Sequence, residues 1–145
     1  MTIRDIQSEV IDELLVLLAP VAQVEEGDVR AIFDSEDTGL PDEFIVLQPG
    51  TTEEVLNGKP RMPNSVPETA VINIVLVSKL RQYARGLRTK RLAVKVATRG
   101  QRCGLSVAGV ASAGFLQETP TRPGDGRRWA AHVMPLQVTY IQPLS

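Results

Sequence analysis

Residues 70–78 read AVINIVLVS, and this stretch decides the fold of the chain. Apart from Asn73 and the terminal Ser78 every residue is apolar, and the β-branched residues Val and Ile predominate. Such a run predicts a β-strand. Because both faces of the strand are apolar except at Asn73, we expect it to lie in a sheet that is covered on both sides.

Two shorter apolar runs on the N-terminal side predict further strands, at Val29–Phe33 and at Phe44–Leu47. An acidic turn over residues 34–39 separates them, and Pro49-Gly50 ends the second strand, which we expect to be central. Residues 50–68 contain two glycines and three prolines, which predicts a long irregular arm. A loop of this length in a compact domain is usually functional or mobile.

Helical periodicity marks the start of the chain. Apolar residues recur at spacings of three and four from Ile3 to Leu18, polar residues fill the opposite face, and Pro20 ends the pattern. The pattern predicts an amphipathic helix over Ile3–Leu18. Thr2 and Asp5 resemble a capping box, with Asp in place of the usual Glu or Gln.

Residues 79–99 fit two patterns. The apolar residues within 92–96 alternate as in a strand, whereas those within 80–87 have helical spacing. We favour a helix over 79–99 with a break near Gly86, because a crossover helix at this point could cover the sheet. A strand stays open as the alternative.

The last third of the chain predicts a closing hairpin. Residues 104–114 are small and glycine-rich, as in a tight turn or a short helix, and residues 115–119 are strand-like. Pro120–Gly126 has the composition of a hairpin turn. The return strand runs over Trp129–Ile141, with a bulge or a sheet edge at Pro135.

The predicted order is helix, two strands, arm, strand, helix and closing hairpin. It indicates an α+β fold in which helices pack on a mostly antiparallel sheet. A chain of 145 residues is expected to form a single domain, residues 1–145, with the arm as an insertion. No apolar run approaches the ~20 residues of a membrane span, and no basic leader precedes the run Leu14–Ala19. We therefore expect a soluble protein of the cytoplasm with no membrane partner.

Charge is segregated along the chain. Residues 1–68 hold fifteen acids and four bases, a formal charge of −11, whereas residues 69–117 hold nine bases and no acid. Such segregation suits the binding of a polyanion. It equally suits contact between copies of the chain, with the acidic part of one against the basic part of the next.

The sequence offers little for catalysis or metal binding. Cys103 and His132 are the only residues of their types, so a zinc site built from Cys and His alone cannot be assembled. An enzyme that uses Cys103 with His132 is one alternative. Gly104–Gly109 lacks the Lys and Ser/Thr of a P-loop, and the acids within 34–43 lack the glycine and terminal glutamate of a calcium loop. We expect no enzymatic activity and no cofactor.

A small basic nucleic-acid-binding module is a second alternative, because clustered Lys and Arg bind phosphates. Tyr83 is the only aromatic residue between residues 79 and 102. Proteins that bind single-stranded nucleic acids stack bases on aromatic side chains. The shortage of aromatic residues favours a protein–protein contact.

The whole chain resembles the tail terminator proteins of long-tailed bacteriophages, also called tail completion or minor tail proteins. The likeness lies in the order of elements and in local composition, and no diagnostic motif is involved. The matching segments are the helix Ile3–Leu18, the run Val29–Asp34, the strand Phe44–Leu47, the arm 50–68, the strand Val71–Val77, the run Val110–Phe115, the Gly/Asp/Arg turn, and the final strand from Trp129 to Val138–Ile141. The basic, glycine-broken middle departs most from the family.

The resemblance implies a ring of six copies that docks on the last ring of the tail tube, stops its polymerisation and offers its other face to the head–tail connector. DNA passes through the ring without sequence-specific binding, and the protein resides in the virion after assembly in the host cytoplasm. A ring uses two different patches of each subunit. The residues expected at the contact with a neighbour or with the tube are Asp34, Glu36, Asp37, Asp42, Glu43, Arg81, Arg85, Arg88, Lys90, Arg91, Lys95 and Arg99. The arm is expected to reach another subunit. Another connector or neck protein of the phage is the nearest alternative.

Overall fold

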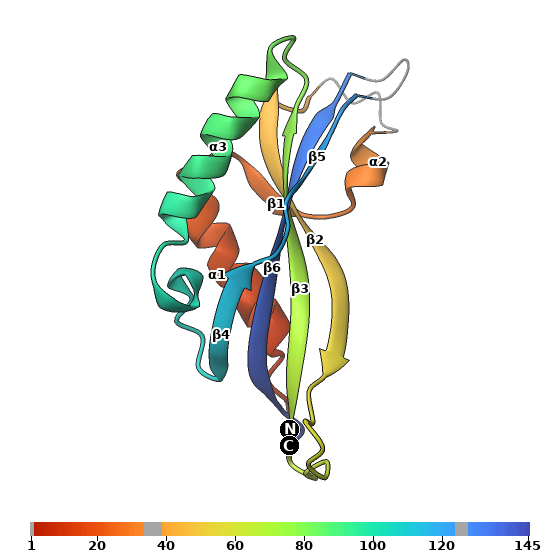
Figure 1. The fold of residues 1–145 in the computed structure, drawn as a ribbon, viewed down its shortest axis with the longest axis vertical. Coiled ribbons are helices and arrows are strands. Elements are labelled where there is room, and N and C mark those ends of the chain that lie inside the picture. The colour runs from red at the N-terminus through yellow and green to blue at the C-terminus, as the bar shows by residue number, and fades with distance from the viewer. Residues whose placement is uncertain (1, 34–38, 124–127) are drawn as a thin grey trace.

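The computed structural model describes residues 2–33, 39–123 and 128–145. These residues form a long, twisted sheet with two helices lying against one of its faces (Figure 1). The elements are α1 (Ile6–Leu18), β1 (Val24–Glu26), α2 (Val29–Phe33), β2 (Glu43–Glu54), β3 (Ser65–Ser78), α3 (Tyr83–Ala97), the 3₁₀ helix η1 (Gln101–Gly104), β4 (Val110–Phe115), β5 (Thr119–Thr121) and β6 (Ala130–Pro143).

The predicted strand at residues 70–78 is confirmed as part of β3, which lies in the middle of the sheet. The strand order is β1-β2-β3-β6-β4, and β5 also pairs with β6. β3 is antiparallel to both of its neighbours and pairs with β6 over its whole length, from Ser65 opposite Pro143 to Ser78 opposite Ala130. Only β1 and β2 are parallel. The prediction of an α+β fold with a mostly antiparallel sheet is therefore confirmed.

The main core lies between the sheet and the helices α1 and α3. Ile72, Ile74 and Leu76 of β3 are buried there with Leu14 of α1 and Val94 of α3. The N-terminal helix is confirmed, although it begins at Ile6 and not at Ile3. The reason is that Asp5 itself is the N-cap, since its carboxylate accepts a hydrogen bond from the Ser8 amide at 3.2 Å.

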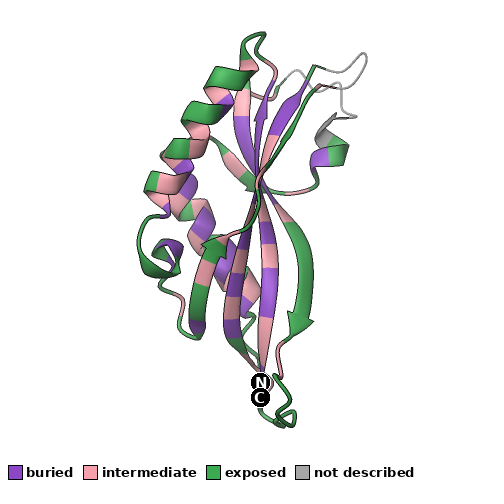
Figure 2. Ribbon diagram, viewed as in Figure 1, coloured by how far each residue is buried: buried purple, intermediate pink, exposed green. Residues whose placement is uncertain are grey.

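The opposite face of the sheet is covered only in part. Phe44, Val75, Val77 and Trp129 are buried there in a second cluster, which includes Val29 of α2. Further along β3 the same face is half-buried (Figure 2). The expectation that both faces of β3 are covered thus holds for its C-terminal half.

Residues 29–33 form the short helix α2, so the predicted strand is wrong. The Asp28 carboxylate accepts a hydrogen bond from the Arg30 amide at 2.9 Å, and the Val29 amide donates to the Gln48 side chain at 3.0 Å. These side-chain acceptors satisfy the first amides of a helical turn, which favours a helix over a strand. The strand beside β2 is instead Val24–Glu26. The predicted acidic turn lies mostly outside the described residues.

The predicted arm at 50–68 is also shorter than expected. β2 continues past Pro49-Gly50 to Glu54, with a bulge between Pro49 and Thr52, and β3 already begins at Ser65. Proline is tolerated because β1 pairs only with residues 45–47, so this part of β2 is a sheet edge. The irregular loop is reduced to residues 55–64, and it lies at the same end of the molecule as both termini (Figure 1).

The basic stretch is a helix, which confirms the favoured prediction, but it is not broken at Gly86. A Cβ atom added at Gly86 would lie 2.6 Å from the Glu43 carboxylate. The glycine therefore allows α3 to lie close to the start of β2 and does not interrupt the helix.

The closing hairpin is confirmed in its pairing, since β5 is antiparallel to β6. Of the predicted turn Pro120–Gly126, Pro120 and Thr121 belong to the strand β5 and residues 124–126 lie outside the described residues. Residues 110–115 form the strand β4 where a turn or short helix was expected, and residues 116–118 belong to no strand. Pro135 causes no bulge against β3; it falls between the part of β6 that pairs with β5 and the part that pairs with β4. None of the described helices is long and apolar enough to cross a membrane.

Replacing Gly50 by Ala should destabilise the protein by about 1–3 kcal/mol, because a Cβ there would lie 2.8 Å from the backbone oxygen of Val71. Gly114→Ala is the matched control, since nothing lies within 4 Å of an added Cβ at that strand position. Urea denaturation of both variants measures the difference. Equal stability of the two variants would contradict the close approach at the bulge.

Candidate interaction surface

The bases of α3 fall into two groups. Three of them turn toward the rest of the chain and have acidic partners. The Lys90 ammonium lies 3.9 Å from the Glu43 carboxylate, and Arg91 and Lys95 both pair with Glu118. These bases stabilise the subunit and are not free for a partner.

Glu118 is the hub of this ionic cluster and did not stand out in the sequence. It accepts two hydrogen bonds from the Arg91 guanidinium, one of them 3.0 Å long, and lies 3.4 Å from the Lys95 ammonium. The His132 imidazole nitrogen is 2.8 Å from the same carboxylate. The hydrogen bonds from Arg91 and His132 and the nearby positive charges together lower the pKa of Glu118 to about 2. The cluster ties α3 to β6.

The second group of bases faces outward. Arg81, Arg85, Arg88 and Arg99 are exposed, and the structure gives none of them an acidic partner among the described residues. Within α3, Arg85 and Arg88 recur with Leu92 and Val96 at spacings of three and four, which places these four residues on one face of the helix. Arg81 and Arg99 flank the two ends of α3. The side chains of Leu92 and Val96 are 58% and 60% exposed. We call these six residues, Arg81, Arg85, Arg88, Leu92, Val96 and Arg99, the outer α3 surface.

Two of the acids expected at a contact are engaged within the chain. The Asp42 carboxylate lies 3.6 Å from the Lys79 ammonium, which in turn lies over the Trp129 ring, and Glu43 pairs with Lys90. Asp34, Glu36 and Asp37 lie outside the described residues. The structure therefore brings Asp42 and Glu43 close to bases of their own chain.

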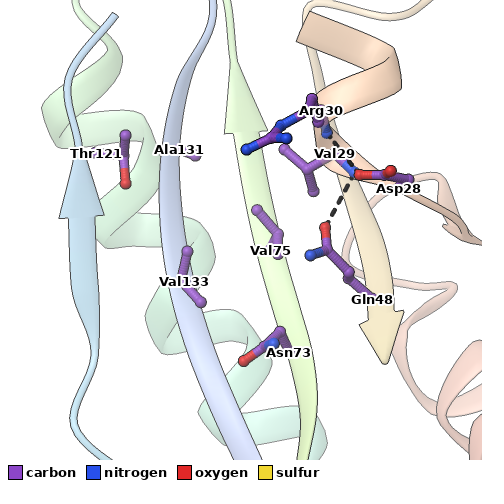
Figure 3. A pocket seen from close by; sticks show the side chains of 9 residues that line it. All are labelled: Asp28, Val29, Arg30, Gln48, Asn73, Val75, Thr121, Ala131 and Val133. Atoms are coloured by element: carbon purple, nitrogen blue, oxygen red, sulfur yellow. Dashed lines mark hydrogen bonds between the residues drawn. The ribbon is translucent and has the colours of Figure 1, made fainter. Parts of the chain in front are cut away.

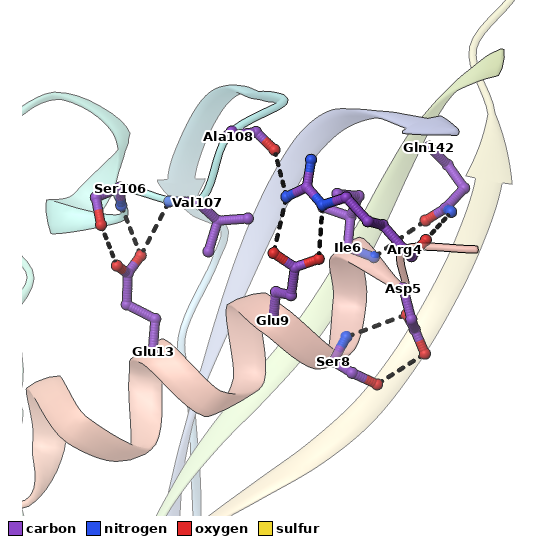
Figure 4. A network of polar contacts seen from close by, with 10 residues as sticks. All are labelled: Arg4, Asp5, Ile6, Ser8, Glu9, Glu13, Ser106, Val107, Ala108 and Gln142. Carbon is purple, nitrogen blue, oxygen red and sulfur yellow. Dashed lines mark hydrogen bonds and ion pairs between the residues drawn. The ribbon is translucent and has the colours of Figure 1, made fainter. Parts of the chain in front are cut away.

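Acids of α1 are also used internally, as Figure 4 shows. The Glu9 carboxylate accepts a 2.7 Å hydrogen bond from Arg4, and this pairing lowers the pKa of Glu9. The Glu13 carboxylate accepts from the backbone amides of Ser106 and Val107, at 2.6 and 3.3 Å. These bonds fasten the segment before β4 to the helix. Described acids that remain exposed without an ion pair are Asp5, Asp12, Glu25, Glu26, Asp28 and Glu53. Asp5 and Asp28 accept hydrogen bonds from nearby backbone amides.

A hollow of about 510 Å³ lies on the less covered face of the sheet, between α2 and β5 (Figure 3). Val75, Ala131 and Val133 line its floor, and the Asn73 and Gln48 amides lie on one side. Gln48 already accepts a hydrogen bond from the Val29 amide. Asp28 and Arg30 also line it, so its walls mix apolar, neutral polar and charged groups. Within the described parts of the chain no cluster of His, Cys, Asp and Glu could hold a metal ion.

Cys103 and His132 have different surroundings. Cys103 is buried in the main core, and burial raises the pKa of its thiol. A raised pKa disfavours the thiolate that a cysteine nucleophile needs. His132 is bonded to Glu118. This arrangement gives the enzymatic alternative no support.

No protein-family model matches the chain, and no curated protein matches it either.

Glu118→Gln should cost about 1–3 kcal/mol of stability at neutral pH, because it removes the charge that Arg91 and Lys95 share. The ordinary pKa of this carboxyl is 4.5, and in the folded protein it is about 2. The stabilising contribution is therefore complete above pH 4.5 and is lost as the pH falls toward 2. Denaturant unfolding between pH 2 and 7 measures the free energy of unfolding of both proteins. The difference between wild type and variant should narrow as the pH falls from 4.5 to 2.

Glu53→Gln provides the control, since Glu53 is exposed and has no ion pair among the described residues. If the difference in free energy of unfolding between wild type and Glu118→Gln stays constant from pH 2 to 7, the ionic role of Glu118 is contradicted.

Proposed function

We propose that this protein is a structural component of a bacteriophage tail, a tail terminator. In this role about six copies form a ring that caps the tail tube, stops its polymerisation and joins it to the head–tail connector. The protein acts by contact alone, with no catalysis and no cofactor. It resides in the neck of the virion, where DNA passes through the ring, after assembly in the host cytoplasm.

The outer α3 surface is the observation that supports this proposal most. It combines four arginines, which have no acidic partner among the described residues, with the exposed apolar side chains of Leu92 and Val96. An apolar centre with arginines around it is typical of protein–protein contacts.

The distribution of charge favours contact between unlike patches. The arginines of the outer α3 surface lie on α3 or at its two ends, whereas the exposed acids Glu25 and Glu26, which have no ion pair among the described residues, lie on the edge strand β1. A closed ring needs two different surfaces on each subunit, and opposite charge helps them to find each other. Residues 55–64, at the end of the β2–β3 hairpin, are the part of the predicted arm that could reach a neighbour.

The order of elements adds a second, weaker argument. The opening helix α1, the strands β2 and β3 and the closing strand β6 follow one another as the resemblance to tail terminators implies, whereas α3 lies in the segment that departs most from the family. Replacement of the run at 29–33 by a helix is a departure from that pattern.

Native mass spectrometry should show a ring, close to a hexamer, at low salt. Reversing two charges in Arg85→Glu/Arg88→Glu should shift the population toward monomers by at least tenfold, because arginine contacts become repulsive. Raising the salt to 1 M, where the screening length is about 3 Å, should weaken the wild-type ring in the same direction. The exposed Arg128, outside α3, serves as the matched control in Arg128→Glu.

Sedimentation with purified tail-tube protein completes the test. Binding to the tube is expected for a terminator, whereas binding to the portal complex alone would identify another connector. A monomer at every salt concentration, or a ring that the double charge reversal leaves intact, would contradict the proposal.

A further inference from the structure

A groove runs between α3 and β5, on the side of the sheet that the helices cover. It consists of two adjoining hollows of about 270 and 620 Å³, which share Arg88 and His132 in their walls. The smaller hollow is lined by Tyr83, Leu87 and Pro120 and by other mostly apolar groups. The larger hollow adjoins the Glu118 cluster, since Arg91 and His132 line it. It also borders the outer α3 surface through Arg85, Arg88 and Leu92.

The walls of the groove are strongly cationic. Arg88 of α3 and Arg122, just after β5, border the smaller hollow, and Arg85 and Arg91 border the larger one. No acidic residue lines either hollow among the residues described. Arg91 is paired with Glu118, but Arg85, Arg88 and Arg122 are exposed and have no acidic partner in the described chain. Three unpaired arginines around one groove repel one another and are stabilised by a bound anion.

The N-terminus of α3 adds to the positive electrostatic potential of the groove. Tyr83 and Ala84, the first residues of the helix, line the smaller hollow. Gln82 makes no side-chain capping bond, and the first turn contains no acid. The free amides of this turn therefore add positive potential to that of the arginines.

We propose that this groove binds an acidic peptide segment of a partner protein, with one apolar side chain of that segment in the smaller hollow. The carboxylates flanking this side chain pair with Arg88 on one wall and Arg122 on the other. Guanidinium groups suit this task because they bind carboxylates through two parallel hydrogen bonds. The apolar anchor fills the hollow that Tyr83, Leu87 and Pro120 line.

The composition of the groove favours a peptide over a nucleic acid. Among the described residues, Tyr83 and His132 are the only aromatic rings in the lining of either hollow, and His132 is held by a hydrogen bond with Glu118. A nucleic-acid groove gains much of its affinity from several aromatic side chains on which bases stack. The apolar floor offers instead a place for an aliphatic side chain.

Fluorescence anisotropy with labelled pentapeptides tests this proposal. The first probe, Asp-Glu-Leu-Glu-Asp, should bind, and the second, Asp-Glu-Gly-Glu-Asp, should bind at least fivefold more weakly because it lacks the apolar anchor. Charge reversal in Arg88→Glu/Arg122→Glu should weaken binding of the first probe at least tenfold. Arg99→Ala, which removes an exposed arginine outside the groove, should leave the affinity unchanged within twofold. Circular dichroism verifies that each variant is folded.

Three outcomes would overturn the proposal: no binding of the leucine probe, equal affinity for the two peptides, or tighter binding of a single-stranded oligonucleotide of the same charge. The titration uses protein below the concentration at which native mass spectrometry detects a ring, so it does not depend on the proposed function. Peptide binding without any ring would contradict the tail terminator alone, and a ring without peptide binding would contradict the groove alone.

Discussion

The rest of the structure depends on the burial of one face of β3 beneath α1 and α3. Ile72, Ile74 and Leu76 meet Leu14 and Val94 there and are almost completely buried. Burial of such side chains contributes about 1.5–3 kcal/mol each. β3 pairs with β2 on one side and with β6 on the other. Because β1 pairs with β2, and both β4 and β5 pair with β6, the position of β3 determines the positions of all the other described strands. The position of α3, and so the direction in which its arginines point, follows from the same contact.

The way in which α3 lies on the sheet divides its basic residues into two groups. Bases at the margins of its buried face, Lys90, Arg91 and Lys95, meet Glu43 and Glu118 and stabilise the subunit. Bases on the outer face have no such partners among the described residues. The basic residues that cluster in the sequence thus form two groups. One group forms ion pairs within the chain, and the other is exposed and available to other molecules. Only the second group supports a contact function.

How far the sequence predicted this structure depends on the range of the interactions involved. The periodicity of α1 and the apolar run of β3 are strong local signals, and both elements were predicted correctly. Residues 29–33 have strand-like composition, but the Asp28 and Gln48 side chains satisfy the amides of a helical turn. Pro49-Gly50 looked like the end of a strand, yet a bulge at a free sheet edge accommodates both residues. Glu118 could not be recognised as a hub because its partners Arg91, Lys95 and His132 are brought to it only by tertiary packing.

A tail terminator of the proposed kind has the outer α3 surface buried in an assembly of several copies. This burial is tested most directly by the reactivity of a cysteine in Leu92→Cys toward a maleimide, measured below and above the concentration at which a ring forms. The native Cys103 is buried and its thiol pKa is raised, so it contributes little to the signal. We expect labelling of residue 92 to slow at least tenfold in the assembled protein. The same labelling rate in monomer and assembly, or the absence of any assembly, would contradict it.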